Sequence, residues 1–218
     1  LSIEENCPSQ FPLDKNNLIT KAYKLMHSYL NSNELEYSIK IKKNIPIGSG
    51  LGGGSSNAAT TLKALNELWN LNFSNKKLEE LGLALGADIP FFIAGGFQLA
   101  EGLGEKLSPQ KMDILHGLCF LLIIPPIHIS TTTAYAELNK SLHPSHYHSK
   151  FPPVSKPVNW QLFENDFENM IRKTYPKIRK LKKSLYDLGA LYSGLSGSGS
   201  AMFGVFDNLN CAKKAQKE

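Results

Sequence analysis

Residues 46–59 read Pro-Ile-Gly-Ser-Gly-Leu-Gly-Gly-Gly-Ser-Ser-Asn-Ala-Ala, and positions 48–54 of this stretch hold five glycines. A glycine backbone can approach a ligand closely and can adopt positive φ angles without strain. An apolar periodic segment follows directly, which predicts a loop that leads into a helix. Exposed N–H groups and the helix dipole at such a terminus favour an anion, so the stretch indicates a phosphate site.

The helix after the glycines is predicted from its apolar positions, which recur at the spacing of one helix face. Ser56 or Asn57 is the expected N-cap, because both side chains can accept a backbone hydrogen bond there. The apolar face consists of Ala58, Ala59, Leu62, Leu65, Leu68 and Trp69.

Three kinds of phosphate loop compete for this stretch. A P-loop requires lysine after its last glycine, but Ser55 follows Gly54. Gly48, Gly50 and Gly53 fit the dinucleotide pattern G-x-G-x-x-G by letter. That pattern needs a preceding strand buried on both faces, whereas residues 37–43 alternate as in a half-exposed antiparallel strand. A plain glycine linker is disfavoured because it would not lead into a patterned helix.

The rest of the chain divides into elements that set the organisation. Helices are expected from Asn17 to about residue 30, from Ser74 to a stop at Gly86, and over 165–188 with a break at Pro176. Strands are expected at 36–43, 97–100, 118–124 (buried) and 201–206, with a turn at 101–105. A change of composition near 108–113 predicts two domains, 1–110 and 111–218.

Bulk composition limits the function classes. The 218 residues carry a net charge of +5 without a long basic block, which fits an anionic small molecule and does not indicate nucleic-acid binding. Three distant cysteines indicate a reducing compartment without a zinc site. His143, His146 and His148 are expected in a polar loop, and no apolar run is long enough to span a membrane.

Seven motifs occur in a distinctive order along the chain. They are Asn-Leu-Ile (17–19), the glycine loop, Leu-Gly-Ala-Asp-Ile-Pro-Phe-Phe (85–92), Glu-Gly-x-Gly-Glu (101–105), Ile-Ser-Thr (129–131), Asn-Asp-x-Glu (165–168) and Ser-Gly-Ser-Gly (196–199). This order resembles that of the 4-diphosphocytidyl-2-C-methyl-D-erythritol kinases, a family in the GHMP kinase superfamily. The Gly-Gly-Gly-Ser-Ser-Asn-Ala-Ala version of the loop differs from the shorter loops of mevalonate and homoserine kinases.

The resemblance implies an α+β fold of two domains with the site between them. A ribosomal-S5-domain-2-like N-terminal domain would bind ATP, and a ferredoxin-like domain would follow. It also implies transfer of the γ-phosphoryl group of ATP to the 2-hydroxyl of 4-diphosphocytidyl-2-C-methyl-D-erythritol, with Mg²⁺. Another GHMP kinase, a non-catalytic nucleotide-binding protein and a nucleic-acid module are the alternatives.

The resemblance also assigns roles to residues of this sequence. The ATP-binding residues it implies are Asn17, Lys43, Pro46, Gly48, Gly50, Leu51, Gly52, Gly53, Gly54, Ser55 and Ser56. The substrate-binding residues it implies are Asp88, Tyr135, Ser196, Gly197 and Ser198. Metal ligands are left unknown, because Glu101 and Glu105 read as solvated turn residues.

Asp88 is the candidate general base, and Tyr135 the candidate aromatic that stacks on the cytosine ring. From local sequence alone, Asp88 reads equally well as the N-cap of a short helix at Ile89-Pro90, and Tyr135 also reads as a core residue. The family's N-terminal Lys-x-Asn and Asp-Gly-Tyr-His segments and a C-terminal tail are not found, so this chain by itself is expected to be inactive or weak. A monomer or homodimer is expected, in a bacterial cytoplasm or a plastid-type organelle.

Overall fold

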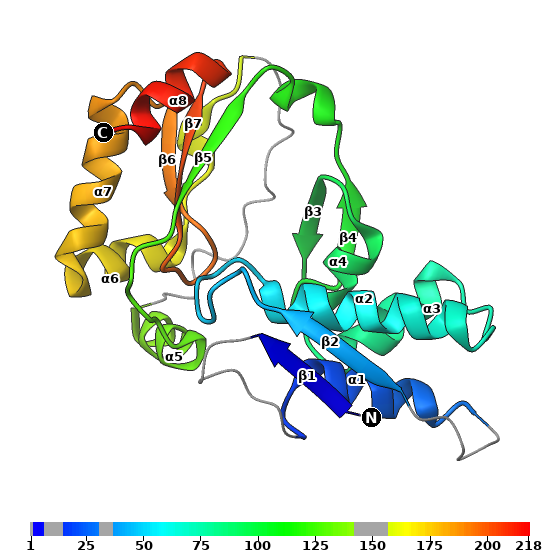
Figure 1. The fold of residues 1–218 in the computed structure, drawn as a ribbon. Helices are drawn as coiled ribbons and strands as arrows, with labels where there is room; N and C mark the ends of the chain where they lie inside the picture. The colour runs from blue at the N-terminus through cyan, green and yellow to red at the C-terminus, as the bar shows by residue number, and fades with distance from the viewer. Residues whose placement is uncertain (1, 7–14, 31–36, 142–156) are drawn as a thin grey trace. The chain divides into compact units, whose positions relative to one another are not determined.

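The computed structural model describes residues 2–6, 15–30, 37–141 and 157–218 (Figure 1). Contacts divide the chain into two compact units. The first consists of residues 1–47 and 52–111, and the second of residues 48–51 and 112–218. The short segment Gly48–Leu51 therefore packs with the second unit, although its sequence neighbours on both sides belong to the first.

The first unit opens with two parallel strands joined through a helix. β1 (Ser2–Asn6) pairs with β2 (Ser38–Lys42), and α1 (Leu18–His27) lies between them in the sequence. β2 has the predicted alternation of half-buried and exposed residues. The antiparallel pairing expected from that alternation is wrong, because alternation reports that one face is open and says nothing of strand direction.

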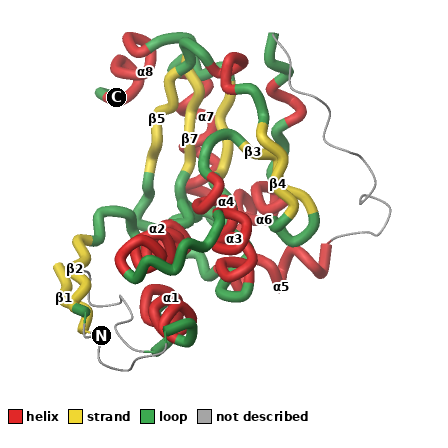
Figure 2. Tube along the Cα trace, turned by 90° about the vertical axis from the view of Figure 1, so that its right-hand side faces the viewer, coloured by secondary structure: helices red, strands yellow, loops and turns green. Residues whose placement is uncertain are grey.

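The core of the first unit forms around α2 (Gly53–Leu68). α1, α3 (Asn75–Leu83) and α4 (Ile89–Ala94) accompany it, and Figure 2 shows these four helices together. The predicted apolar face of α2 is buried except at Leu68, whose side chain is 62% exposed. Burying the other large side chains contributes roughly 1.5–3 kcal/mol each.

Two local predictions for this unit hold and one does not. Ser74 caps α3 by accepting a hydrogen bond from Lys77 N. β3 (Gln98–Glu101) and β4 (Lys106–Pro109) form an antiparallel hairpin around the expected turn. Gly86 does not end α3 in the predicted manner, since the helix already finishes at Leu83 with Ala84 as its C-cap.

The second unit is an antiparallel sheet of three strands with helices on one face. β5 (Cys119–Ile123), β6 (Tyr192–Leu195) and β7 (Met202–Phe206) lie in the order β5-β7-β6. α7 (Pro176–Asp187) and α8 (Leu209–Gln216) contact the sheet. α5 (Thr131–Ser141) and α6 (Asp166–Thr174) complete the helices, with short 3-10 turns at Met112–Leu115 and Trp160–Leu162. Pro176 stands at the start of α7, so the predicted break is confirmed.

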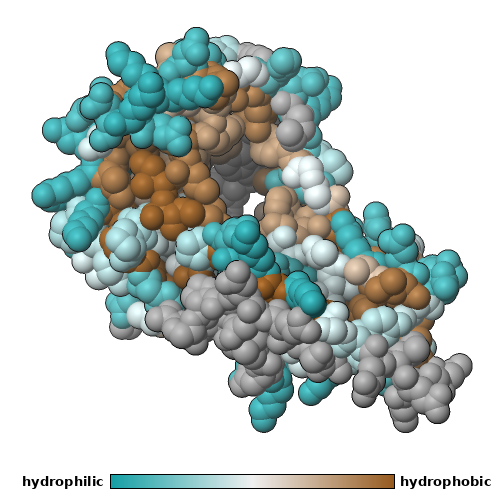
Figure 3. All heavy atoms as spheres, in the orientation of Figure 1, coloured by the Kyte–Doolittle hydropathy of each residue, from teal (hydrophilic) through white to brown (hydrophobic). Residues whose placement is uncertain are grey.

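β5 departs from its prediction as a buried strand. It is an edge strand, and Phe120 and Leu122 on its outer side are 53% and 46% exposed. Figure 3 shows hydrophobic residues gathered in the area of these strands. Hydrophobicity alone indicated burial, but α7 and α8 cover only one face of the sheet, where Cys119, Leu121 and Ile123 pack, and Phe120 and Leu122 point to the other face. Among the described helices, none has the length and apolarity required to cross a bilayer.

Candidate phosphate-binding and catalytic site

α2 starts four to five residues earlier than the sequence predicted. Its first residue is Gly53 and its N-cap is Gly52, which has a left-handed backbone (φ 64°) and provides no side-chain cap. The expected cap at Ser56 or Asn57 is wrong, because both residues already lie in the helix. The first N–H groups of a helix lack intrahelical partners. Without a cap at Gly52, those of α2 are available to a ligand.

A lysine lies beside this helix end. A Cβ atom built on Gly53 would lie 2.8 Å from Lys43 Nζ, so the ammonium group lies directly against the first residue of α2. The positive end of the helix dipole and a lysine charge attract the same kind of ligand, a phosphate group. Lys43 therefore lies at the first turn of α2, and its ATP-binding role stays a prediction.

Asn17 is the N-cap of α1. It is 4% exposed, and its side-chain oxygen caps α1 by accepting from Ile19 N at 2.9 Å. The next residue, Leu18, places its Cδ1 atom 3.5 Å from a Cβ built on Gly54. The start of α1 therefore packs against the first turn of α2, although the predicted nucleotide contact of Asn17 itself stays a prediction.

Asp88 occupies the N-cap position of α4, one of its two predicted alternatives. Its side chain is exposed and makes no capping hydrogen bond, so the purely structural role is only half fulfilled. One helical turn further on, the Phe92 ring lies 2.6 Å from a Cβ built on Gly52. Ile89 and Pro90 are buried and fix the start of α4. Asp88 thus begins a short helix that packs on the N-terminus of α2.

The other half of the glycine run, Gly48–Leu51, meets the glycine-serine loop between β6 and β7. Ser196 Oγ donates to Gly50 O at 3.0 Å, and Ala201 N donates to Ser49 O at 2.9 Å. Gly50 has φ +75°, and a Cβ there would lie 2.1 Å from Ser196 O. The two glycine-rich segments therefore pack closely through their backbones, and the expectation that both line one anion site stays a prediction.

The remaining substrate-binding candidates lie in the second unit. Ser198 is buried, with its hydroxyl 3.4 Å from that of Thr131. Tyr135 is 53% exposed, so it is not the core tyrosine of the alternative interpretation. Its ring meets Phe167 edge to face at 4.9 Å. Aromatic pairs favour edge-to-face geometry, so this contact restrains the orientation of the Tyr135 ring.

Glu105 has a local role in the β3–β4 turn. Its carboxylate accepts a hydrogen bond from Leu103 N at 2.6 Å. Bonds from its own backbone N–H and from that of Leu103 lower the pKa of the Glu105 carboxyl, because they stabilise the charged form. Within the described ranges, no group of three or more His, Cys, Asp or Glu side chains could hold a metal ion.

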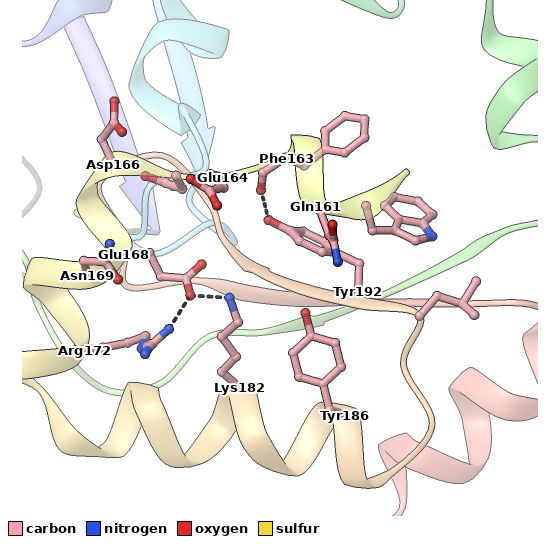
Figure 4. A pocket seen from close by; sticks show the side chains of 13 residues that line it. Gln161, Phe163, Glu164, Asp166, Glu168, Asn169, Arg172, Lys182, Tyr186 and Tyr192 are labelled. Atoms are coloured by element: carbon pink, nitrogen blue, oxygen red, sulfur yellow. Dashed lines mark hydrogen bonds and ion pairs between the residues drawn. The ribbon is translucent and has the colours of Figure 1, made fainter. Parts of the chain in front are cut away.

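Sequence reasoning missed a buried ion cluster and the cavity beside it. Glu168 of α6 is 5% exposed and pairs with Arg172 of the same helix and with Lys182 of α7 (Figure 4). The cavity has a volume of about 450 Å³, and Tyr192 of β6 lines it with the cluster. The Asn-Asp-x-Glu motif was the available signal, but spacing alone does not identify Lys182 as a partner.

Tyr192 titrates unusually in this environment. Burial, followed by the negative charge of Glu168, raises the pKa of Tyr192 to about 12. Its hydroxyl donates to Phe163 O, and Figure 4 shows it pointing along the cavity towards that carbonyl. The ring of Tyr192 also stacks on Trp160, with centroids 5.7 Å apart.

Comparison with known proteins gives the context of these features. The sequence matches the GHMP kinases N terminal domain over residues 17–96 and the GHMP kinases C terminal domain over 152–218. It is 41% identical over 216 residues to the 4-diphosphocytidyl-2-C-methyl-D-erythritol kinase of Thermodesulfovibrio yellowstonii, covering 93% of this chain and 73% of that protein. The kinase of the same name from Chlorobium phaeobacteroides is 37% identical, with 94% and 70% covered.

Solved structures agree with the sequence comparison. A crystal structure of a 4-(cytidine 5'-diphospho)-2C-methyl-D-erythritol kinase matches with a TM-score of 0.76 and 26% identity, covering 100% of this chain and 78% of that one. A homoserine kinase from Cytophaga hutchinsonii matches with a TM-score of 0.77 at 22% identity, covering 100% and 75%, and shares the fold. The two-domain GHMP fold expected from the motifs is confirmed. The chain therefore belongs to the 4-diphosphocytidyl-2-C-methyl-D-erythritol kinase family of the GHMP kinases.

Proposed function

We propose that this protein transfers the γ-phosphoryl group of ATP to the 2-hydroxyl of 4-diphosphocytidyl-2-C-methyl-D-erythritol. This step belongs to the methylerythritol phosphate route to isoprenoid precursors. The observation that carries the proposal is the uncapped N-terminus of α2 with Lys43 Nζ against Gly53. Relatives at 34–41% identity that bear the name of this kinase supply the substrate.

Phosphoryl transfer proceeds through a loose transition state, so positioning and charge stabilisation provide most of the catalysis. The amides of Gly53, Gly54 and Ser55 would bind phosphate oxygens, with the Lys43 ammonium compensating their charge. Pro46 and Gly48–Leu51 would set the path of the backbone into this site. The first-turn position of these groups supports the assignment of the whole stretch to ATP.

The residues present fit a hydrated magnesium ion. Mg²⁺ commonly keeps several waters and binds through few protein ligands together with substrate phosphates. A dedicated cluster of carboxylates is therefore not needed. Ser55 and Ser56, in the first turn of α2, would hold the ion through their hydroxyls or its waters. When bound, the ion neutralises charge on the phosphates.

Asp88 would act as the general base for the 2-hydroxyl. A carboxylate in this role must come within about 2.6–3.2 Å of the hydroxyl oxygen in the productive complex. The exposed Asp88 carboxylate, at the start of a helix fixed on the N-terminus of α2, supports this role. Its αR backbone and lack of a capping bond leave the side chain available for substrate.

The second unit would bind the cytidylyl part of the substrate and complete the phosphate loop. Tyr135 would stack on the cytosine ring, an interaction that contributes about 1–3 kcal/mol. Ser196, Gly197 and Ser198 would contact phosphates or substrate. We assign residues 1–110 to an ATP-binding domain and 111–218 to the C-terminal domain, and infer a monomer or homodimer in the cytoplasm or a plastid-type organelle.

The direct test is a phosphorylation assay on the intact protein with ATP, Mg²⁺ and three alcohols. We expect ADP formation with 4-diphosphocytidyl-2-C-methyl-D-erythritol, and phosphorus NMR should show a new phosphomonoester on the product. Mevalonate and homoserine should support at most a small fraction of that rate. Preference for either of these would identify a different GHMP kinase, and ATP binding without phosphorylation of any alcohol would identify a non-catalytic protein.

A further inference from the structure

Asn165, the first residue of the Asn-Asp-x-Glu motif, makes three hydrogen bonds with its side-chain amide. Its oxygen caps α6 by accepting from Phe167 N at 3.0 Å. Its nitrogen donates to Leu195 O and to Gly197 O, both at 2.9 Å. An amide has two donor hydrogens and one acceptor oxygen, so each is used here. One side chain thus joins a helix terminus to a loop thirty residues further along the chain.

The loop to which Asn165 donates also forms hydrogen bonds with Ser49 and Gly50 in the first half of the glycine run. Ser196 stands between the two carbonyls bound by Asn165, and its hydroxyl donates to Gly50 O at 3.0 Å. On the other side of the loop, Ala201 N donates to Ser49 O at 2.9 Å. Leu51, the next residue after Gly50, directly precedes the N-cap of α2. A continuous series of hydrogen bonds therefore runs from α6 to the backbone that enters the phosphate site.

We propose that Asn165 is a positioning residue for ATP, which fixes the Ser196–Gly199 loop and through it the Ser49–Gly50 backbone. This inference rests on the proposed function for its ligand, whereas its structural part stands on the hydrogen bonds of Asn165 and Ser196 alone. The Asn165 side chain needs no contact with the nucleotide. It acts by removing alternative conformations of a loop whose glycines would otherwise leave it free to move.

The chemistry of the amide explains why close substitutes fail in different ways. Aspartate keeps the cap oxygen and suits a helix N-terminus, but its carboxylate would face two carbonyl oxygens that need donors. Serine also caps a helix, but it is shorter and has a single donor. Both changes preserve α6 while they release the loop, which separates the positioning role from a merely structural one.

The test compares Asn165→Asp with Asn208→Asp, a matched control. Asn208 caps α8 of the same unit by accepting from Cys211 N at 3.0 Å. We expect Asn165→Asp to weaken binding of a non-hydrolysable ATP analogue about tenfold, equivalent to about 1.4 kcal/mol. Because Ser196, Gly197 and Ser198 are also proposed to contact phosphates or substrate, affinity for the cytidylyl substrate should fall as well, and the affinity for the ATP analogue decides the test. Asn208→Asp should change neither affinity.

Amide hydrogen exchange without nucleotide gives the second measurement. The amides of Gly199 and Ala201 donate within the loop and to Ser49 O, so their exchange should accelerate at least about tenfold in Asn165→Asp. Exchange within α6 should be unchanged, because aspartate still caps it. If Asn165→Asp does not fold, Asn165→Ser replaces it with the same expectations.

The outcomes separate this inference from the proposed function. Unchanged exchange at Gly199 and Ala201 would show that Asn165 does not fix the Ser196–Gly199 loop, whatever the protein binds. Accelerated exchange with unchanged affinity for the ATP analogue overturns the positioning role for ATP. If the unaltered protein binds no ATP analogue, the proposed function fails, and accelerated exchange would still support the structural part of the inference.

Discussion

Asp88 illustrates how a residue can occupy a structural position without using it. It stands at the N-cap of α4, yet its side chain is exposed and makes no capping bond. The substitution Asp88→Asn keeps the size and the capping ability of the side chain. It removes only the charge and the proton-accepting ability that the proposed general-base role needs.

We expect Asp88→Asn in the intact protein to lower kcat by about 10²–10⁴-fold, the usual contribution of a general base. The dissociation constant for an ATP analogue should change by less than about threefold, because the proposed phosphate contacts come from α2 and Lys43 and not from Asp88. Asp113→Asn, at an exposed acidic residue of the second unit, is the control. Near-normal turnover of Asp88→Asn would remove Asp88 from the mechanism.

Gly50 and Gly117 separate two reasons for glycine in one unit. Both have positive φ, +75° and +87°, but a Cβ on Gly50 would meet Ser196 O at 2.1 Å whereas one on Gly117 would meet nothing within 4 Å. Gly117→Ala should cost about 1–2 kcal/mol of unfolding free energy from the left-handed backbone alone. Gly50→Ala should cost at least about 1–3 kcal/mol more, because the backbone must move. Urea unfolding measures both, and equal losses would contradict the packing described for Gly50.

At the scale of elements, sequence rules succeeded where the cause is local. Pro176 separates α6 from α7, Ser74 caps α3, and the glycines at 102 and 104 make the β3–β4 turn. They failed where a partner is distant or where no side chain gives the signal. Gly52 starts α2 through its left-handed backbone, and a search for capping side chains therefore pointed to Ser56 or Asn57.

The candidate site shows the same division. The glycine loop and the family resemblance point to Lys43 and Asp88, whose roles stay predictions. The role of Asn165 depends on carbonyls of Leu195 and Gly197, and the ion pair of Glu168 depends on Lys182. Sequence spacing does not reveal such long-range partners, because they meet only through the packing of α6 with α7 and β6.

The raised pKa of Tyr192 in β6 predicts how the stability of the protein changes at high pH. Its pKa is about 12 in the folded protein, chiefly through burial and then through Glu168, against about 10 in the unfolded chain. A raised pKa contributes stability that is complete below pH 10 and is lost as the pH rises from about 10 to 12.

Tyrosinate absorbance should therefore show one tyrosine that titrates near pH 12 and is missing in Tyr192→Phe. Glu168→Gln should move this titration to lower pH, because it removes the negative charge next to the phenol. Glu137→Gln is the control, since Glu137 is an exposed residue of α5. A Tyr192 that titrates near pH 10 in the unaltered protein would contradict both the burial of the phenol and the influence of Glu168.

At the scale of the whole molecule, the second unit is not continuous in sequence. It includes Gly48–Leu51, which in the sequence lies between two parts of the first unit. A boundary placed at residues 110 and 111 on composition comes close to the division at Lys111 and Met112, but composition cannot reveal four residues that pack elsewhere. The hydrogen bonds of Ser196 and Ala201 to this segment explain why they do.

A fragment of residues 112–218 should therefore be less stable than the same unit in the full chain. It lacks the carbonyls of Ser49 and Gly50, so two hydrogen bonds worth about 0.5–1.5 kcal/mol each are lost. Tryptophan fluorescence of Trp160 during urea unfolding reports on this unit in both proteins, with Trp69 of the full chain replaced by phenylalanine. An unchanged unfolding midpoint would contradict the contribution of Gly48–Leu51 to the stability of the second unit.

A side chain at Gly48 and one at Gly50 would meet different kinds of atoms, and a screen for second-site suppressors should reveal the difference. A side chain on Gly48 would collide with the His128 imidazole at 2.5 Å, whereas one on Gly50 would collide with backbone atoms of Ser196 and Gly199. Trimming His128 can make space at the first position, so a revertant screen of a Gly48→Ala strain has a second site to find. No replacement at position 196 or 199 removes a main-chain carbonyl. Revertants of Gly50→Ala should consequently restore the glycine codon itself.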